Sequence, residues 1–343
     1  MVTKRPKIIS INSVVSESYL SIRAIIGLEP TSSLASKNVT PLSRIRLLKK
    51  NKFNLTLKIN EQEHLLETDH FGHFSHRIKL EQPEEENNFT LLGKISGDST
   101  LYYLGEYRPS ILNKEKKVII SDFDKTLVET KYKTIKEVYQ SLTSPVSHFP
   151  SIKYSVEFLK TQINNNYMPF ILSSSPNFYG PSIKEWLENN QIPSNNIFLK
   201  DYRQFLSLFP TDLFLKDINS HGVHKLSQLI NIYLMTNIPK EIILIGDNSE
   251  SDPIIYSIFS KIVDDNFTPD DLWSEIKTRK EFLFTNSQSL KFLNKLYQAK
   301  NLNKKRKIKS ITKVYIRSIP GTKNKKMPKF LDQYHRKIEY FEN

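Results

Sequence analysis

The stretch Lys117–Leu127, KVIISDFDKTL, starts with a short apolar run and ends in two aspartates that are separated by one residue. The β-branched run 118–120 predicts a strand that is buried on both faces of a parallel sheet. Asp122 and Asp124 would then lie at the C-terminal end of that strand. Ligands of open α/β sheets bind at this edge. We therefore interpret the two carboxylates as part of a metal and phosphate site.

Three further motifs supply other groups for such a site, in a fixed order along the chain. The apolar run PFILS ends at Ser173, which Ser174 follows. Lys225 opens the helical stretch KLSQLINIYL, and the run EIILIGDNSESD predicts a strand that leads into Asp247 and Asp252. Each of these groups comes after a predicted strand or at the start of a predicted helix. We expect them to meet at one edge of the sheet.

The first motif resembles the D-x-D-x-T pattern of the haloacid dehalogenase (HAD) superfamily, with Asp122, Asp124 and Thr126 at its defined positions. Within that superfamily the chain resembles the phosphatidate phosphatase catalytic domain family typified by the fungal actin-patch protein, and its bacterial relatives. The motifs of that family read approximately SDIDDT, YVSNSP, HK and GDSGEQDPEIY. The corresponding stretches here read SDFDKT, ILSSSP, HK and GDNSESDPIIY.

The chain departs from the family pattern beside the predicted catalytic residues. Lys125 stands where relatives have a third acid, and Asn177 replaces an aromatic residue. The resemblance implies an α/β fold with a HAD-like Rossmannoid parallel sheet and a small cap or none. An open site of this kind suits a substrate that is presented on a macromolecule or a membrane, because a small metabolite would need a lid that excludes water.

The resemblance implies Mg²⁺ as the cofactor. Its ligands would be a carboxylate oxygen of Asp122, the backbone carbonyl of Asp124 and a carboxylate oxygen of Asp247. Asp252 would be a further ligand or would support the others. Mg²⁺ prefers such oxygen ligands and keeps room for water and substrate phosphate.

The resemblance also implies the catalytic roles. Asp122 would attack phosphorus and form an aspartyl-phosphate. Asp124 would protonate the leaving oxygen and then deprotonate the water that hydrolyses the intermediate. Ser173, Ser174 and Lys225 would hold the phosphoryl oxygens.

Two other sets of residues compete with this assignment. Lys200 follows a strand-like run and is the alternative to Lys225 as the third-motif lysine. His221 and His224 lie three residues apart and could bind a metal. We interpret them instead as loop and helix-start residues, because no third nitrogen or sulfur ligand lies near them in the sequence.

Composition limits the classes of protein to which the chain can belong. Its 343 residues allow two domains, and its net charge of +14 favours anionic partners such as phospholipid surfaces, nucleic acid or phosphorylated substrates. The absence of cysteine excludes disulfides and thiolate metal sites. No apolar run approaches the ~20 residues of a membrane span. We predict a cytoplasmic protein without a transmembrane segment, with peripheral attachment to a membrane as an alternative.

The distribution of apolar runs predicts three regions. Residues 1–112 contain short apolar runs between Asn, Pro, Ser and Gly, which indicate an all-β, sandwich-like domain. Strands and helices then alternate, which predicts a parallel sheet in a catalytic domain over 113–320. A helical insertion at about 265–310 precedes Val314–Arg317, which resembles a family strand of the type IYIRD. Residues 321–343 would form a basic C-terminal tail. Helices of the second region are expected at 135–142, 156–164, 179–190, 223–236 and 253–259.

The last part of the chain is strongly basic. Between Asn301 and Met327 there are ten Lys or Arg and no acid. Such a run is typical of a solvated tail, but its position after an amphipathic helix also suits contact with an anionic membrane or nucleic acid. The charges of that contact would be Lys304, Lys305, Arg306, Lys307, Lys309, Lys323, Lys325 and Lys326.

These features together predict a Mg²⁺-dependent phosphatase that acts on a phosphatidate-like lipid phosphomonoester. One alternative is the same chemistry on a soluble or polynucleotide phosphomonoester. The other alternative is a non-catalytic module that binds an anion or a lipid. Release of inorganic phosphate separates the enzymes from the module.

Overall fold

The structure is a computed structural model of the chain. It describes residues 4–30, 51–83, 87–130, 150–201, 221–284, 286–306, 309–322 and 325–342. The helix expected at 135–142 and the basic residues Lys307 and Lys323 lie outside these ranges.

A six-stranded parallel sheet carries the motifs described above. Its strand order is β11-β10-β9-β12-β13-β14, and every neighbouring pair is parallel. Numbered within this sheet, the order is 3-2-1-4-5-6, as in doubly wound α/β folds. The order reverses between β9 and β12, so ligands are expected at the C-terminal ends of these two strands. The bounds are β9 (Lys117–Asp122), β10 (Met168–Pro176), β11 (Ile197–Lys200), β12 (Glu241–Asp247), β13 (Ile311–Arg317) and β14 (Ile338–Phe341).

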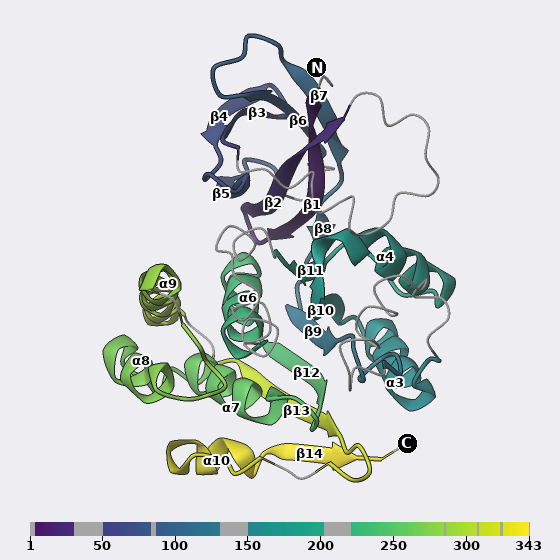
Figure 1. Cartoon of the computed structure of the whole chain (residues 1–343), viewed down its shortest axis with the longest axis vertical. Coiled ribbons are helices and arrows are strands. Elements are labelled where there is room, and N and C mark those ends of the chain that lie inside the picture. Colours follow the sequence, from purple (N-terminus) through teal and green to yellow (C-terminus); the bar gives the residue numbers. More distant parts are fainter. Residues whose placement is uncertain are drawn as a thin grey trace.

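Helices cover both faces of this sheet (Figure 1). Ile119 of β9 packs in the core formed with α3 and α4, whereas Val118 and Ile120 pack in the core formed with α6 and α7. Successive side chains of a strand point to opposite faces, so all three are buried. The predicted parallel sheet with helices is confirmed. The bounds are α3 (Lys153–Asn164), α4 (Gly180–Asn189), α6 (His221–Met235) and α7 (Asp252–Val263).

Two more helices lie beyond α7, in the segment predicted to be a helical insertion. They are α8 (Pro269–Lys277) and α9 (Asn286–Lys304), and α9 packs against both α6 and α8. Thr268 caps α8 by accepting a hydrogen bond from the backbone N–H of Asp271. Within the described ranges, no helix combines the length and the apolar character needed to cross a lipid bilayer.

Two four-stranded, mainly antiparallel sheets precede the parallel sheet. Their orders are β5-β2-β1-β8 and β4-β3-β6-β7. They share one apolar core, to which Leu20 and Ile22 contribute from the first sheet and Leu57 and Leu91 from the second. The burial alternation along β3 places every second residue in this core. The bounds are β1 (Lys4–Ser16), β2 (Tyr19–Pro30), β3 (Phe53–Ile59), β4 (Gln62–Glu67), β5 (His73–Lys79), β6 (Phe89–Ile95), β7 (Tyr102–Tyr107) and β8 (Ser110–Ile111).

The first antiparallel sheet contacts the parallel sheet and α6 at several points. Val14 of β1 belongs to the same core as α6. Ser16 Oγ donates a hydrogen bond to the carbonyl oxygen of Thr236, just after α6 (2.8 Å). His73 Nε2 lies 2.5 Å from Asp201 Oδ2, just after β11. The domain boundaries predicted at 112 and 320 remain predictions.

The C-terminal segment differs from the basic tail that we expected over 321–343. Ile338–Phe341 forms β14, which pairs with β13 at the edge of the parallel sheet. Leu331 and Tyr334 are buried in the core beside α7, in η5 (Lys329–Leu331) and α10 (Asp332–His335). A few apolar residues are enough to pack this segment against the core. We missed them because we interpreted the stretch from its overall positive charge.

Candidate active site

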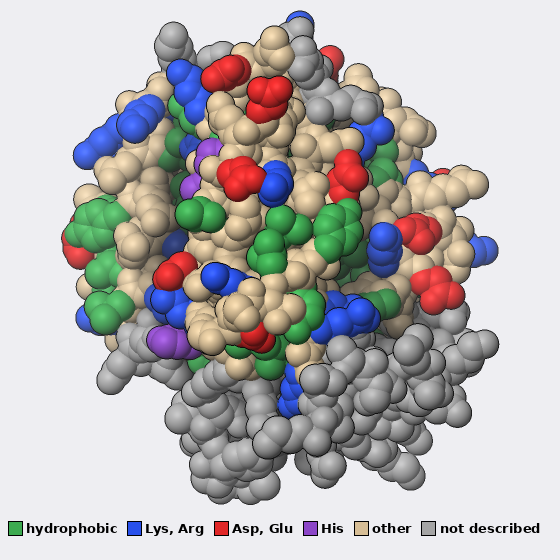
Figure 2. All heavy atoms as spheres, turned by 90° about the horizontal axis from the view of Figure 1, so that it is seen from above, with side chains coloured by type: hydrophobic (Ala, Val, Ile, Leu, Met, Phe, Trp, Pro, Cys, Tyr) green, Lys and Arg blue, Asp and Glu red, His purple; other side chains and the backbone are tan. Residues whose placement is uncertain are grey.

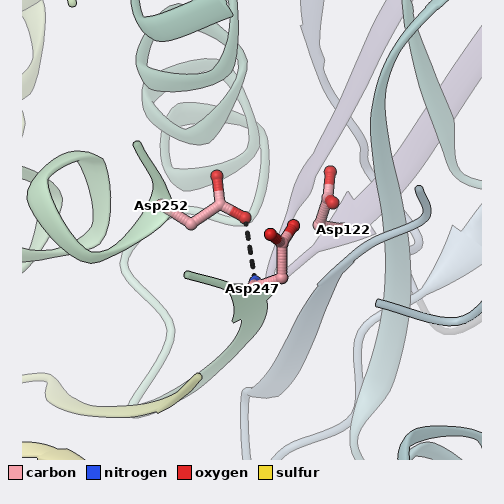
Figure 3. A group of neighbouring side chains, drawn as sticks. All are labelled: Asp122, Asp247 and Asp252. Atoms are coloured by element: carbon pink, nitrogen blue, oxygen red, sulfur yellow. Dashed lines mark hydrogen bonds between the residues drawn. The ribbon is translucent and has the colours of Figure 1, made fainter. Parts of the chain in front are cut away.

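The switch point of the parallel sheet brings three carboxylates together (Figure 3). Asp122 ends β9, Asp247 ends β12, and Asp252 begins α7. Each offers a carboxylate oxygen within 4.8 Å of the others, and all three residues are buried. The structure thus gathers three of the predicted site residues at the edge where ligands of such sheets bind.

Lys225 lies inside this carboxylate cluster. Its Nζ atom lies 3.0 Å from Asp122 Oδ1, 2.7 Å from Asp252 Oδ1 and 3.0 Å from Glu250 Oε2. Lys225 follows the first turn of α6, and its side chain is 1% exposed. Lys200, the alternative lysine, is buried at the end of β11, two strands away from β9. This geometry favours Lys225 as the third-motif lysine.

The glycine before Asp247 leaves the space that Asp252 occupies. A Cβ atom on Gly246 would lie 2.5 Å from Asp252 Oδ2 and 2.8 Å from the ring of Tyr256. The backbone N–H of Asp247 donates to Asp252 Oδ2 (3.3 Å), and the Tyr256 hydroxyl donates to the carbonyl oxygen of Ile245 (3.0 Å). The end of β12 and the start of α7 therefore hold the two carboxylates in fixed relation.

The carboxylate of Asp124 contacts the end of β10. Its Oδ2 atom accepts hydrogen bonds from Ser173 Oγ (2.7 Å) and Ser175 Oγ (3.0 Å). Ser173 Oγ also accepts a hydrogen bond from the backbone N–H of Ser175 (2.9 Å), and Ser174 lies half-buried between them in the chain. We did not predict the role of Ser175. The two-residue period of a strand could have indicated it, because Ser173 and Ser175 lie on one face of β10.

The loop after Asp124 is held from β13. The Nη1 atom of Arg317 donates to the carbonyl oxygen of Lys125 (2.7 Å), and its Nη2 atom forms an ion pair with Glu129. Lys125 has a φ angle of 57°, a left-handed conformation that is unfavourable for residues other than glycine. Thr126 Oγ1 donates to the Oδ2 atom of Asp122 (3.3 Å). Arg317 therefore supports the loop that aligns Asp122.

The electrostatics of the cluster follow from burial and from unequal numbers of charges. Burial raises the pKa of Asp122 well above its ordinary range, and Lys225 opposes this effect. Burial also raises the pKa of Asp252, to about 7. The pKa of Asp247 is raised by burial and by the charge of Glu250. Burial would lower the pKa of Lys225, but the surrounding carboxylates outweigh it and keep this pKa well above its usual value.

The residues of the cluster fit a divalent cation. Three aspartates and Glu250 lie around the ammonium group of Lys225, so the carboxylates outnumber the buried lysine within the cluster. The Oδ2 atom of Asp247 is buried, and no donor in the described part of the chain reaches it. A buried carboxylate oxygen without a partner is costly unless a cation binds it. Oxygen ligands alone are also the set that Mg²⁺ and Ca²⁺ prefer.

The remaining sequence expectations lie at the edge of this site. His221 and His224 lie in the first turn of α6, which agrees with their interpretation as helix-start residues. Glu250 and Arg317 were not predicted to contribute. Glu250 lies within the GDNSESD run, so its position beside Asp247 was a usable signal. Arg317 comes from a strand seventy residues after Asp247, and its contacts depend on the tertiary structure.

Comparison with solved structures gives only distant similarity. A calcium-binding mutant of Bacteroides uniformis beta-glucuronidase 2 is 10% identical, with a TM-score of 0.24; the match covers 90% of this chain and 33% of the glucuronidase chain. A carbohydrate acetylesterase from Xanthomonas citri is 7% identical, with a TM-score of 0.25, over 94% of this chain and 70% of the esterase. Likeness at these TM-scores defines neither fold nor activity. The comparison with curated proteins found no match.

The comparison with protein families gives a direct match. The matching model is described as phosphatidate phosphatase APP1, catalytic domain, and it covers residues 117–268. This range begins with β9 and includes β10, β12 and the start of α7, so it contains the carboxylate cluster and Lys225. The stretch from 117 to 268 therefore belongs to the family of the phosphatidate phosphatase APP1 catalytic domain, as its motifs predicted.

Proposed function

We propose that the chain is a phosphatidate phosphatase-like enzyme of the HAD type, which hydrolyses a lipid phosphomonoester through an aspartyl-phosphate on Asp122. The observation that carries this proposal is the ion pair between Asp122 and Lys225 inside a buried group of carboxylates. A merely structural aspartate would not need three acidic neighbours, because their charges destabilise one another. Perturbed, partnered titratable groups of this kind are typical of catalytic sites.

The proposed cofactor is Mg²⁺, held by carboxylate oxygens of Asp122, Asp247 and Asp252 and by the backbone carbonyl of Asp124. When bound, it would neutralise charge on the phosphoryl group and on the attacking carboxylate. The Oδ2 atom of Asp247, which no donor among the described residues reaches, supports this assignment.

The protein residues would carry out two displacements at phosphorus. In the first, an oxygen of Asp122 forms a bond to phosphorus while the ester P–O bond breaks, and Asp124 gives its proton to the departing oxygen. In the second, Asp124 takes a proton from water, the water oxygen bonds to phosphorus, and the bond to Asp122 breaks. Asp124 suits this role because it lies two residues after Asp122 in the chain but its carboxylate is held separately, by Ser173 and Ser175.

Lys225 and the serines at the end of β10 would hold the phosphoryl oxygens. Lys225 already contacts Asp122, so its charge lies beside the attacking carboxylate and would offset the negative charge of the phosphoryl oxygens that approach it. Ser173 and Ser174, with the Ser175 hydroxyl beside them, would donate hydrogen bonds to the same group. In the structure, the hydroxyls of Ser173 and Ser175 donate to Asp124.

The test is release of inorganic phosphate from a panel of substrates in the presence of Mg²⁺. The panel contains phosphatidate in mixed micelles, polynucleotide ends, a sugar phosphate and an aryl phosphate. We expect turnover of phosphatidate to be the fastest, to stop with a chelator and to return with Mg²⁺. Preference for a polynucleotide or soluble ester would overturn the lipid assignment, and turnover that survives a chelator would overturn the metal site. No turnover of any substrate would leave an anion-binding module.

A further inference from the structure

The connection between α8 and α9 carries positive charge and exposed leucines. Between residues 276 and 292 there are four Lys or Arg and one acid. That acid, Glu281, is buried and pairs with Arg279 (3.3 Å), so the cations left on the surface are Lys277, Lys280 and Lys291. Leu283 and Leu290 are 48% and 73% exposed. We call the described residues of 277–291 the α8–α9 tip.

A cluster of aromatic side chains supports the tip from below. The ring of Phe284 lies 4.6 Å from that of Trp273 and 5.3 Å from that of Phe292. Phe282 and Phe292 are buried. Leu283 thus stands exposed between two aromatic residues that face the core, and its exposure is built into a packed segment.

The α8–α9 tip lies at the same edge of the sheet as the carboxylate cluster. A Cβ atom on Gly222 would lie 2.3 Å from the carbonyl oxygen of Glu281, so the tip packs directly on the start of α6. Lys225, three residues further along α6, contacts Asp122. One turn of α6 therefore separates Gly222, which the tip contacts, from Lys225, which contacts the proposed nucleophile.

The direction of α9 places Leu290 at this edge too. Lys295 Nζ donates to Ser227 Oγ (2.6 Å), and the Tyr233 hydroxyl donates to Asn303 Oδ1 (2.6 Å). Both helices run in the same direction, because the later residue of α6 contacts the later residue of α9. Leu290 precedes Lys295 by five residues, or about 7.5 Å of helix, which brings it level with the start of α6.

The first part of the basic run, around Arg306 and Lys309, lies at the opposite edge. Arg306 donates to the carbonyl oxygens of Val263 (2.5 Å) and Asp264 (3.3 Å), at the end of α7. That end is twelve residues, or about 18 Å, from Asp252. Lys309 pairs with Asp264 (3.8 Å). The membrane contact that we expected for Lys304 to Arg306 would therefore face away from the site.

We propose that the α8–α9 tip docks on the surface of an anionic lipid bilayer and brings the carboxylate cluster to its substrate. The inference rests on the proposed function, because docking at this edge matters only for a substrate held in the bilayer. Leu283 and Leu290 insert among the lipids, while Lys277, Lys280 and Lys291 bind the anionic headgroups. Lys291 also lies 4.0 Å from Asp69, which tempers its contribution.

The described residues on the face of the antiparallel sheets carry charges of both signs (Figure 2). Seen from the antiparallel sheets, acidic, basic and apolar side chains are interspersed among the described residues of that face (Figure 2). Charges of both signs cancel at a membrane surface, whereas the tip presents one sign around two leucines. Leu65, 82% exposed on β4, is therefore a suitable control for an exposed leucine outside the tip.

The experiment measures binding of the full chain to vesicles of phosphatidylcholine with and without phosphatidylserine, in the absence of substrate. In Leu283→Gln/Leu290→Gln we expect binding to fall at least about tenfold. In Lys277→Gln/Lys280→Gln each lost charge should weaken binding about fivefold. Added salt should weaken it as well, because attraction is screened over about 10 Å at 0.1 M ionic strength.

Three control variants share the chemistry of these substitutions but lie elsewhere. They are Leu65→Gln, Lys304→Gln/Lys305→Gln and Ile311→Gln, the last at an exposed residue where β13 begins. We expect all three to bind vesicles like the parent, and every variant to release phosphate from a soluble aryl phosphate at the parental rate. Unchanged thermal unfolding checks the fold.

The proposal is overturned if the parent does not bind anionic vesicles, or if the controls lose as much affinity as the tip variants. It is also overturned if the tip variants lose affinity for a polynucleotide while they keep that for vesicles. Failure of the proposed function gives a different result. Vesicle binding would then depend on the tip, but no phosphomonoester would be hydrolysed.

Discussion

The two edges of the parallel sheet carry charge in different ways. At the C-terminal edge four carboxylates surround one lysine: Asp122, Asp247, Asp252, Glu250 and Lys225. Three of these carboxylates and the lysine are buried. The charges do not balance, and burial makes each interaction strong in both directions.

At the N-terminal edge the charges lie in ion pairs that remain near water. Lys309 and Lys337 both lie within 4.0 Å of Asp264, at 3.8 and 3.5 Å, and are more than half exposed. Lys313 pairs with Glu241 (3.8 Å) in the same manner. Exposed pairs of this kind contribute little to stability.

The difference indicates which edge the protein uses. Water solvates the charges of an exposed ion pair, so such a pair needs no ligand. An unbalanced, buried cluster is unfavourable by itself and becomes favourable when a cation or a phosphoryl group completes it. The imbalance at Asp122 is therefore the property that the following experiments should change.

Replacing the proposed nucleophile should have the largest effect. We expect Asp122→Asn to lower phosphate release by several orders of magnitude, because an amide is a poor nucleophile. The fold should persist, since the substitution removes a buried charge and keeps the shape. The measurement is the rate of phosphate release by the purified variant, and thermal unfolding checks that the variant is folded. Parental turnover in a folded variant would remove Asp122 from its role.

Replacing Lys225, the lysine inside the carboxylate cluster, should destabilise the C-terminal edge strongly. Lys225→Met leaves its carboxylates without a cation, and loss of one partner from a buried ion pair costs about 3–5 kcal/mol. Denaturant unfolding without metal measures this loss. The matched variant Lys309→Met, at the other edge, should change the free energy of unfolding by less than about 1 kcal/mol. Equal effects at both edges would contradict the comparison.

A methyl group added at Gly246, next to Asp252, should weaken catalysis and its activation by Mg²⁺. In Gly246→Ala the new Cβ atom must displace Asp252 or Tyr256. Small misplacements of catalytic groups lower rates by about 100-fold, so we expect a loss of that order with weaker activation by Mg²⁺. Gly180→Ala is the control, since its nearest neighbour would lie 3.5 Å away. A Mg²⁺ titration of phosphate release compares the two variants.

The smallest effect concerns pH. The pKa of Asp252 is about 7 in the folded chain and its ordinary value is 3.8, so the metal-free folded state holds a proton that the unfolded chain releases between these values. The free energy of unfolding without metal should therefore fall as pH rises toward 7. Bound Mg²⁺ replaces that proton, so the increase in melting temperature with Mg²⁺ should be larger at about pH 8 than at about pH 6.

Thermal unfolding at both pH values, with Mg²⁺ or with a chelator, tests this prediction. Asp252→Asn removes the titrating group, so its response to Mg²⁺ should vary less with pH. A Mg²⁺ effect in the parent that grows as pH falls would show that Asp252 does not compete with the metal.

The sequence alone determined the parts of the site that local patterns specify. Apolar runs of strand length placed Asp122 and Asp247 at strand ends and Ser173 in the C-terminal half of β10, because a strand that is covered on both faces must be apolar along its length. The spacing GD-x₄-D likewise placed Asp252 at a helix start. These features depend on neighbours in the chain, and the family match over 117–268 agrees with them.

Only the tertiary structure decided which distant groups meet. It brought Lys225, and not Lys200, to Asp122, and it brought Arg317 to the loop of Lys125. It also placed the exposed leucines of the α8–α9 tip at the edge with the site, and it placed Arg306 and Lys309 at the other edge. The physical reason is that strand order and helix direction set these contacts. Both result from packing the whole core, and neither leaves a periodic signal in a short stretch of sequence.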